Sequence, residues 1–265
     1  MNDISRSPGG LQPVFKLCQI ERTKSGLEDI KTEEIQPMIE WIRLTSDEVN
    51  SIDRKLPVII PIGLIEAHGH HLSLGLDNDT ADYFSRRIAE ATGAILAPTL
   101  YYGFADAMRE YPGTIGVTVE TLSHVIHDIA VMFYQQGFKK QIYLSGHGAN
   151  KLACELGFHK AWERCPDLKP VYWNYWSEAG FNQIHHADKG ETEIALAIGS
   201  IVYPERAQDY SFKKPWHLVN SRYQYQPETG GINGYPTQAD QTEGERMREE
   251  IVLRLSAKAK EAIAD

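Results

Sequence analysis

The sequence feature that most constrains the fold is an apolar run, Val58–Ile62, which leads into a loop rich in glycine and histidine. A short β-branched run of this kind predicts a strand buried on both faces, as in a parallel sheet covered by helices. Ligands of α/β proteins bind in loops at the carboxyl ends of such strands. Here the loop holds Glu66 and His68, which share one face of an extended chain, and Asp77 follows nine residues after His68. Two carboxylates and an imidazole suit zinc or another divalent transition metal, so we expect a metal site.

Strand and helix patterns alternate through the rest of the chain. Thr45 and Glu48 have the spacing of a capping box at the start of a first helix. Further helices are predicted over residues 80–91, 118–136, 150–163, 191–201 and 240–264, and strands over residues 56–62, 94–97, 141–144 and 170–173. This alternation is typical of an α/β fold with a mainly parallel sheet.

Composition argues against several classes of protein. The net charge of −9, with no basic run to offset it, argues against a nucleic-acid partner. No apolar stretch approaches the length of a membrane span, and the 3 cysteines show no paired spacing, so we expect a cytoplasmic protein without membrane contact. Residues 1–35 are weakly patterned and are interpreted as an N-terminal extension, with one domain over residues 36–265. Residues 205–238 predict a long ordered loop that acts as a lid or a subunit contact.

Two further loops carry polar side chains next to a predicted helix. Residues 145–150 place His147 between two glycines at the end of a strand, although a helix start capped by Asn150 explains them equally well. In residues 185–193, the acidic side chains of Asp188 and Glu193 fit a simple interaction with the helix dipole. His186 and Glu191 are stronger candidates for the site, because two other ligand-bearing loops already precede them in similar positions.

Other catalytic motifs are missing from the sequence. It contains no EF-hand, zincin helix, P-loop or dinucleotide fingerprint, and no serine in a nucleophile elbow. Cys154 falls inside a predicted helix without an obvious base. Metal-assisted chemistry is therefore the favoured enzymatic interpretation, and covalent catalysis is the weakest.

Taken in order, the motifs resemble those of the creatininase family of metal-dependent amidohydrolases, from about Trp41 to the end of the chain. Any one motif alone would be weak, whereas the ordered set is specific. The resemblance rests on Pro61–Gly63, Glu66-x-His68-Gly69-x-His71-Leu72, Leu74–Asp77, Tyr111–Ile115, Gly146–Asn150, His186-Ala187-x-x-x-Glu191-Thr192, Gly231–Gly234 and Glu243-x-Glu245.

The resemblance implies a layered α/β/α subunit, often assembled as a homo-oligomeric hexamer, with two divalent ions (zinc, manganese or iron) in each active site. It assigns Glu66, His68, Asp77 and His147 as metal ligands, with Asp77 bridging the ions, and His186 as the histidine that transfers a proton.

One position departs from the pattern of the creatinine hydrolases. These enzymes carry a ligand glutamate where this chain has Ala149. In family members with a small residue at that position, the glutamate matching Glu191 is the natural substitute ligand. Creatinine is therefore a less favoured substrate, and whether Glu191 is a ligand or an acid–base catalyst stays open.

The ligand set predicts a mechanism and a class of substrate. Two cations sharing a water would present hydroxide to a carbonyl carbon and stabilise the oxyanion that forms. His70 and His71 are expected either to orient Glu66 or Asp77 or to be purely structural.

Aromatic side chains in the flanking loops suit a flat ring in the substrate. The candidates for substrate binding are the aromatic residues Tyr102 and Trp176, together with Asn150. A small-molecule cyclic amide or lactam is the expected substrate. Three alternatives stay open: a deformylase acting on a formamide of a pyrimidine-like compound, a metal-dependent phosphoester hydrolase, and a non-catalytic metal-binding homologue.

Overall fold

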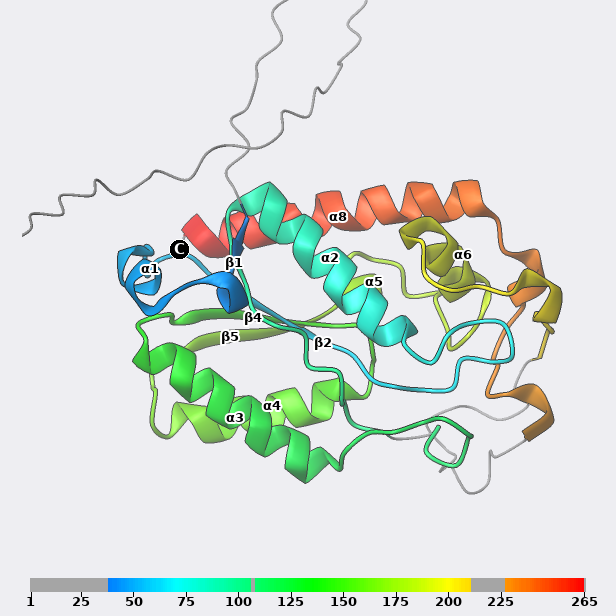
Figure 1. Ribbon diagram of the computed structural model, residues 1–265, viewed down its shortest axis with the longest axis horizontal. Helices are drawn as coiled ribbons and strands as arrows, with labels where there is room; N and C mark the ends of the chain where they lie inside the picture. The colour runs from blue at the N-terminus through cyan, green and yellow to red at the C-terminus, as the bar shows by residue number, and fades with distance from the viewer. Residues whose placement is uncertain (1–37, 106–107, 211–226, 265) are drawn as a thin grey trace, which may run out of the picture.

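A five-stranded sheet in which every strand runs parallel to its neighbours forms the centre of the protein (Figure 1). The computed structural model describes residues 38–105, 108–210 and 227–264. The sheet order is β1 (Ile39–Glu40), β3 (Ile95–Leu96), β2 (Val58–Ile62), β4 (Lys140–Ser145) and β5 (Lys169–Asn174). The predicted α/β fold with a parallel sheet is therefore confirmed, and the predicted extension over residues 1–35 lies outside the described residues.

Helices cover both faces of the sheet, which confirms the layered α/β/α architecture. In Figure 1 one layer contains α2 (Leu76–Thr92), α6 (Lys189–Ile198) and α8 (Gln241–Ala264), and the other contains α3 (Val119–Gln135) and α4 (Asn150–Trp162). Side chains of β2 alternate between these layers: Ile59 packs in the core with Phe84 of α2, whereas Ile60 packs with Ile126 of α3. Burial on both faces explains why the β2 sequence is apolar throughout.

Short elements lie between the longer ones along the chain. They are η1 (Trp41–Arg43), α1 (Ser46–Ser51), α5 (Tyr175–Glu178), η2 (Pro204–Arg206), η4 (Pro227–Thr229) and η5 (Pro236–Gln238). The predicted capping box is present, because the Thr45 N–H donates to Glu48 Oε2 at 2.7 Å and the Glu48 N–H donates to Thr45 Oγ1 at 3.4 Å. Among the described residues, no helix has both the length and the apolar character needed to cross a membrane. The long loop predicted over residues 205–238 is described only in part, since residues 211–226 fall outside the structure.

Two helices, α2 and α6, differ from the prediction by more than one residue, and the start of α2 bears on the site. Helix α2 begins at Leu76 instead of residue 80, so Asp77 lies in its first turn. A carboxylate in that turn is stabilised by the helix dipole. The polar side chains of Asp77 and Asn78 are buried there, and this interrupts the apolar pattern that marks the rest of the helix. Helix α6 ends at Ile198 because Gly199 adopts a left-handed conformation, with φ of 75°.

The strand order places a crevice between β2 and β4. From β2 the chain moves to β3 on one side, and it returns on the other side with β4. The loops that follow β2 and β4 consequently diverge, which is the arrangement where parallel sheets bind ligands. At this point Gly146 approaches the first turn of α2 so closely that a Cβ atom would collide with the backbone carbonyl of Asp77.

We predict that Gly146→Ala destabilises the protein by about 1–3 kcal/mol, because it forces an atom into filled space between two backbone segments. The matched control is Gly148→Ala two residues away, where an added Cβ would meet nothing nearer than Trp176 at 3.7 Å. Urea unfolding of both variants measures the difference. Equal midpoints for the two variants would contradict the close approach described here.

Candidate metal centre

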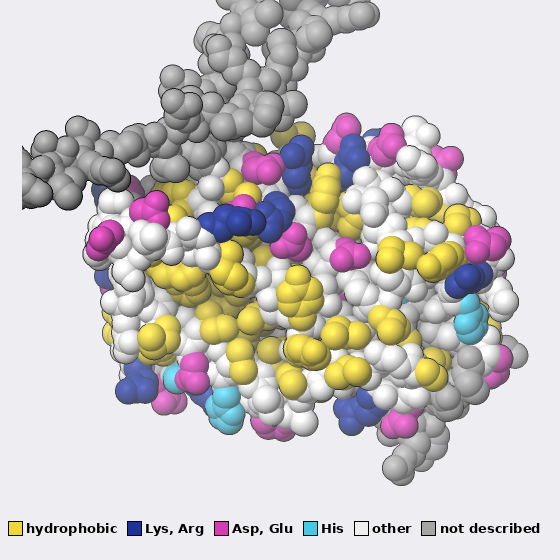
Figure 2. All heavy atoms as spheres, in the orientation of Figure 1, with side chains coloured by type: hydrophobic (Ala, Val, Ile, Leu, Met, Phe, Trp, Pro, Cys, Tyr) yellow, Lys and Arg dark blue, Asp and Glu magenta, His cyan; other side chains and the backbone are white. Residues whose placement is uncertain are grey.

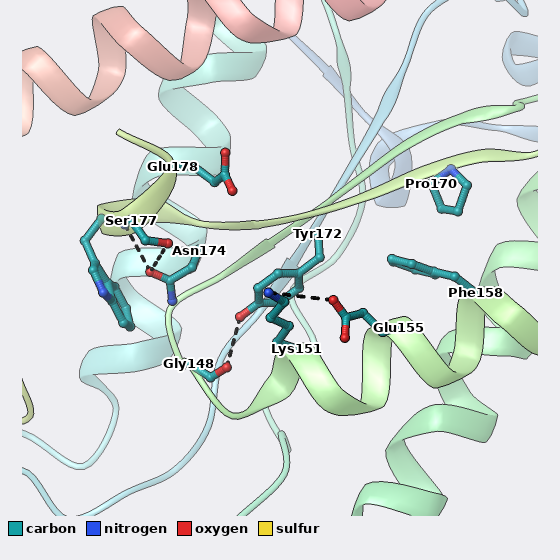
Figure 3. Close-up of a pocket in the computed structure, with 10 residues that line it drawn as sticks. Gly148, Lys151, Glu155, Phe158, Pro170, Tyr172, Asn174, Ser177 and Glu178 are labelled. Carbon is teal, nitrogen blue, oxygen red and sulfur yellow. Dashed lines mark hydrogen bonds and ion pairs between the residues drawn. The ribbon is translucent and has the colours of Figure 1, made fainter. Parts of the chain in front are cut away.

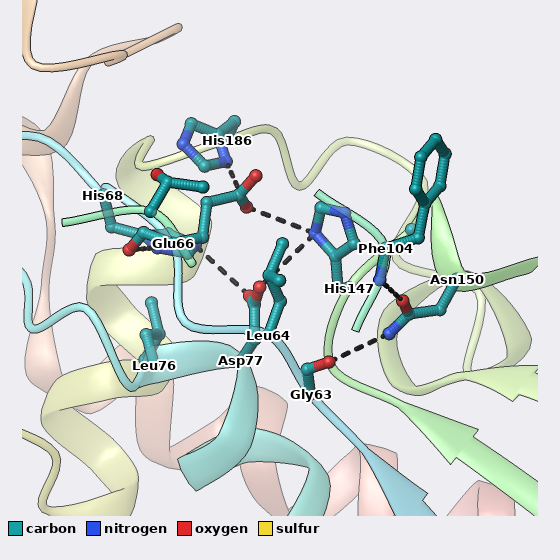
Figure 4. Close-up of polar contacts among 12 residues, drawn as sticks. Gly63, Leu64, Glu66, His68, Leu76, Asp77, Phe104, His147, Asn150 and His186 are labelled. Carbon is teal, nitrogen blue, oxygen red and sulfur yellow. Dashed lines mark hydrogen bonds and ion pairs between the residues drawn. The ribbon is translucent and has the colours of Figure 1, made fainter. Parts of the chain in front are cut away.

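Polar side chains from four segments converge at the carboxyl ends of β2 and β4 (Figure 4). Two groups of their ligand atoms share Asp77 and have every atom within 4.8 Å of the others: Glu66, Asp77 and His147 in one, and His68, Asp77 and Glu191 in the other. A third group, described below, includes His186. The structure thus brings together all five residues that the sequence suggested as metal ligands. Asp77 belongs to both groups.

The two carboxylate oxygens of Asp77 face different histidines. Oδ2 lies 3.3 Å from His147 Nδ1, which is also 3.2 Å from Glu66 Oε2. Oδ1 lies 3.3 Å from His68 Nε2, which is 3.7 Å from Glu191 Oε2. A carboxylate with one oxygen in each group has the position of a bridging ligand.

Backbone contacts fix the orientation of the His68 ring. Its Nδ1 lies 3.1 Å from the carbonyl oxygen of Glu66. Because a carbonyl only accepts, Nδ1 donates this hydrogen bond, and the lone pair of the neutral ring is on Nε2, facing Asp77 and Glu191. Metal-binding histidines in proteins commonly donate their second N–H in this way.

The start of helix α6 holds Glu191 in place. Asp188 is the N-cap residue of α6, and its side chain accepts a hydrogen bond from the Glu191 N–H at 3.0 Å. This agrees with the interaction at the helix start that the sequence suggested for Asp188. Glu191 Oε2 in turn accepts the N–H of Ala187 at 2.5 Å. Glu193 points elsewhere: it accepts hydrogen bonds from Lys189 and from the backbone of Asp240.

Burial and mutual attraction shift the pKa values of these groups strongly. Burial alone would lower the pKa of His68, but the carboxylates of Asp77 and Glu191 outweigh it and raise that pKa to about 10. Burial raises the pKa of Glu191 to about 8, even though His68 acts in the opposite direction. The pKa of Glu66 is lowered despite burial, because His147 and His186 favour the carboxylate.

The cluster also contains buried polar atoms without a hydrogen-bond partner among the described residues. They are Glu66 Oε2, His68 Nε2, Asp77 Oδ2 and His147 Nε2. Each unpaired buried polar group costs about 1–3 kcal/mol, so such a concentration in a folded protein indicates a ligand-binding site. Carboxylate oxygens and imidazole nitrogens are metal-ligand atoms that suit zinc, manganese or iron. The residues present therefore fit divalent metal ions.

His186 lies against this cluster from the side of the cavity. Its Nε2 lies 2.8 Å from the carbonyl oxygen of Ala67, to which it must donate, and its Nδ1 is 3.7 Å from Glu66 Oε2. Its ring is 4.4 Å from that of His68, measured between centroids. Burial, reinforced by the charge of His68, lowers the pKa of His186 to about 4. The Glu66, His68 and His186 ligand atoms also lie within 4.8 Å of one another.

A cavity of about 320 Å³ opens over these side chains. Trp176 and Asn233 form part of its wall, together with the three carboxylates of the cluster and the imidazoles of His147 and His186. Of the three substrate-binding candidates, the structure brings only Trp176 to this cavity. Tyr102 is 55% exposed and does not line it. Asn150 is fully buried, donates to the Gly63 carbonyl and accepts from the Phe104 N–H, so it joins three loops.

Neither His70 nor His71 contacts Glu66 or Asp77 through a hydrogen bond in the structure. His70 is exposed and faces the carbonyl of Glu228 at 3.1 Å. His71 is fully buried, and its Nε2 lies 2.9 Å from the Thr192 hydroxyl, which itself donates to the carbonyl of Asp188 at 2.7 Å. His71 therefore supports the first turn of α6, next to Glu191. Sequence reasoning missed this pairing because 121 residues separate the two partners.

The fold and the site define an α/β protein with a buried carboxylate–imidazole cluster at the point where the sheet order reverses. The family model for creatininase, described as creatinine amidohydrolase, matches residues 43–259. The chain belongs to the creatininase family.

Two relatives and one solved structure illustrate this membership. The creatinine amidohydrolase of Pseudomonas putida is 27% identical over 172 residues, which cover 56% of this chain and 65% of that enzyme. A mycofactocin precursor peptide peptidase of Mycobacterium ulcerans is 26% identical over 212 residues, covering 74% of this chain and 81% of the peptidase. A crystal structure of creatininase superposes with a TM-score of 0.75 at 22% identity, covering 87% of this chain and 100% of the other. The chain thus spans just under two thirds of the Pseudomonas enzyme, and the superposition shows the fold.

We predict that His71→Leu lowers the free energy of unfolding by about 1–3 kcal/mol, because the Thr192 hydroxyl loses the hydrogen bond that it accepts in a buried position. His71→Gln can still donate to Thr192 and should lose less. Urea unfolding of the metal-depleted protein measures both variants. A similar loss in the two variants would show that the ring fills space and that its hydrogen bond contributes little.

Proposed function

We propose that this protein is a metal-dependent amidohydrolase that cleaves a C–N amide bond of a small molecule, with a cyclic amide or lactam as first choice. The observation that carries the proposal is the shared carboxylate of Asp77 between two buried ligand groups. Glu66, Asp77 and His147 would hold one divalent ion, and His68, Asp77 and Glu191 would hold the second. Bound at these positions, zinc, manganese or iron ions acidify a water molecule and polarise a carbonyl group.

The relatives support this assignment. The creatinine amidohydrolase of Pseudomonas putida is an amidohydrolase by name, and solved creatininase structures include a Zn-Zn type and a manganese form. In the present chain Ala149 lines the cavity and offers no ligand atom, whereas the Glu191 carboxylate reaches the group of His68 and Asp77. This arrangement favours Glu191 as a ligand over Glu191 as the acid–base catalyst. It also favours a substrate other than creatinine.

His186 is suited to moving the proton that amide hydrolysis requires. Since Nε2 donates to the carbonyl of Ala67, Nδ1 is the atom that exchanges a proton, and it faces Glu66 across the cavity wall. A neutral imidazole accepts a proton as the water attacks and delivers it to the departing nitrogen. His186 also lines the cavity, so a substrate amide can reach it.

The substrate class rests on the shape and chemistry of the cavity. A volume of about 320 Å³ with Trp176 in the wall suits a flat ring of modest size. A formamide of a pyrimidine-like compound presents the same C–N bond and is the alternative within small molecules. A peptide bond is the second candidate, because the mycofactocin precursor peptide peptidase aligns over 74% of this chain.

The test is turnover by protein reconstituted with zinc, manganese or iron. The panel contains lactams and other cyclic amides, formamides and short peptides, and mass spectrometry follows product formation. We expect a lactam or cyclic amide to be opened to the corresponding amino acid. Metal binding without turnover of any amide would support the non-catalytic homologue, and phosphate release from phosphoesters would support the phosphoester hydrolase.

We also predict that the ligand variants differ in metal stoichiometry. Asp77→Ala should lose both ions because it removes the shared ligand, whereas His147→Ala should lose mainly the ion that it shares with Glu66. Elemental analysis after dialysis gives the metal content per subunit, and both variants should be inactive. Equal metal content in wild type and Asp77→Ala would contradict the assignment of the bridge.

His186→Ala should retain both ions yet turn over about 10²–10⁴-fold more slowly, the usual contribution of a positioned acid–base group. Elemental analysis and kcat are measured on the same preparation. Loss of a metal ion in this variant would instead assign His186 as a ligand, in the group that it forms with Glu66 and His68.

We further propose that the chain acts as a homo-oligomer, with a hexamer as first choice. Apolar side chains spread over the face that carries α2 and α3 in Figure 2. Exposed apolar residues of the described chain include Tyr101, Tyr102, Ile115 and Met132, each at least 55% exposed. Surfaces of this kind commonly mark contacts between proteins. Light scattering coupled to size-exclusion chromatography gives the oligomeric state.

A further inference from the structure

A second cavity of about 480 Å³ lies beside the metal centre, between β5 and α4 (Figure 3). Gly148 and Trp176 line both cavities, so the second one begins where the wall of the first ends. We call it the β5 groove. Pro170, Tyr172 and Asn174 form its floor, because alternate residues of a strand share one face.

Asn174 presents an unpaired hydrogen-bond donor to the β5 groove. Its side chain is 6% exposed, and its Oδ1 accepts from the N–H of Ser177 at 3.4 Å, which caps helix α5. Its Nδ2, in contrast, makes no hydrogen bond to any described residue. In Figure 3 the amide nitrogen is turned away from Ser177, toward the side of the groove where Gly148 lies. A buried donor in this state costs free energy unless a ligand accepts from it.

The Tyr172 hydroxyl is the protein group that could compete for this donor. Burial raises the pKa of Tyr172 and the Asn174 amide partly offsets the shift, so the two side chains are neighbours. The hydroxyl donates its own proton to the carbonyl of His147 at 3.1 Å. The geometry between Nδ2 and Tyr172 does not meet that of a hydrogen bond, so Nδ2 stays unpaired among the described residues.

Charged groups of the β5 groove are already paired. Lys151 lies 3.7 Å from Glu155, and Glu178 lies 2.7 Å from Lys258. Aromatic side chains of Phe158, Tyr172 and Trp176 also line the groove. A neutral donor between aromatic walls recognises a neutral acceptor on a flat group, and the carbonyl of an amide combines both properties.

We propose that the substrate carries an arm that extends from its scissile amide past Trp176 into the β5 groove, where an amide carbonyl of the arm accepts a hydrogen bond from Asn174 Nδ2. This inference rests on the proposed function and narrows its substrate class from bare rings to amides that bear a peptide-like substituent. The arm lies on the far side of Trp176 from the metal ligands, so it takes no part in bond cleavage.

The experiment compares ligands with and without the arm. The ligands without the arm, called bare heads, are γ-butyrolactam, which is cyclic, and acetamide, which is acyclic. The ligands with the arm, called armed ligands, are pyroglutamyl-glycinamide and N-acetylglycyl-glycinamide. They add neutral amide carbonyls to the cyclic and the acyclic head, respectively. Isothermal titration calorimetry gives dissociation constants for the full chain, both metal-depleted and metal-loaded. The variants are Asn174→Ser, which keeps an oxygen suitable for capping α5, and the matched control Asn50→Ser on the exposed surface of α1.

We expect at least one armed ligand to bind about tenfold more tightly than its bare head, as one net hydrogen bond to a buried donor provides. Asn174→Ser should lose most of this preference, Asn50→Ser should retain it, and metal content should not change in either. If the serine variant folds poorly, Asn174→Asp, which also keeps the capping oxygen, replaces it.

Equal affinity for armed and bare ligands, survival of the preference in Asn174→Ser, or no binding of either armed ligand would each overturn the inference. Selective binding of the arm without hydrolysis of any amide would overturn the proposed function and leave the β5 groove assignment standing. Hydrolysis of an amide without preferential binding of the armed ligands would support the proposed function and overturn the β5 groove assignment.

Discussion

The Asp77 carboxylate is the group on which the rest of the site depends. It is 2% exposed, and its two oxygens face His68 and His147 from opposite sides at 3.3 Å. A buried carboxylate is stable only when positive charge or hydrogen bonds compensate for its lost hydration. The fold provides the first part of this compensation by placing Asp77 in the first turn of α2, where the helix dipole favours an anion. The two histidines, or metal ions held between them and the carboxylates, provide the remainder.

The close approach of Gly146 to α2 connects this electrostatic requirement to the sheet. The strand end that carries His147 reaches Asp77 only because no side chain separates the two backbone segments. Likewise, the first turn of α6 holds Glu191 next to His68. Asp188 accepts the Glu191 N–H and the Ala187 N–H donates to the Glu191 carboxylate, while His71 hydrogen-bonds to Thr192 in the same turn. The site is thus assembled from the carboxyl ends of two neighbouring strands and the amino ends of two helices, which is where a parallel sheet concentrates its unpaired polar groups.

Much of this arrangement could be predicted from the sequence, for a physical reason. The apolar run of β2, the capping box at Thr45 and the alternation of elements are local signals, and local signals specify an α/β fold. The proximity of Glu66, His68, Asp77, His147 and Glu191 followed from the rule that loops at the ends of parallel strands converge, together with the family resemblance. The convergence of loops and the family resemblance both describe the path of the backbone, and neither fixes the direction of an individual side chain.

Side-chain direction is where the sequence was insufficient. Asn150 follows His147 closely, yet it turns inward to bind the carbonyl of Gly63, and Tyr102 turns toward solvent. The partner of His71 lies on a helix that sequence spacing does not relate to it. Asn174 could not be identified at all, because the distinction between its capping oxygen and its unpaired nitrogen exists only once β5, α5 and α4 are packed together.

The backbone of Ala187 has a consequence for the behaviour of the site. Its φ of 50° lies in the left-handed region, where a residue with a Cβ atom costs about 1–2 kcal/mol relative to ordinary conformations. The methyl group is fully buried in a small apolar cluster with Leu72 and Ile232, and this contact offsets the strain. A glycine would relax the turn but would also let the flanking peptide planes rotate. Ala187 follows His186 directly and its N–H donates to Glu191 Oε2, so this strained but well-packed turn links the cavity histidine to the carboxylate at the start of α6.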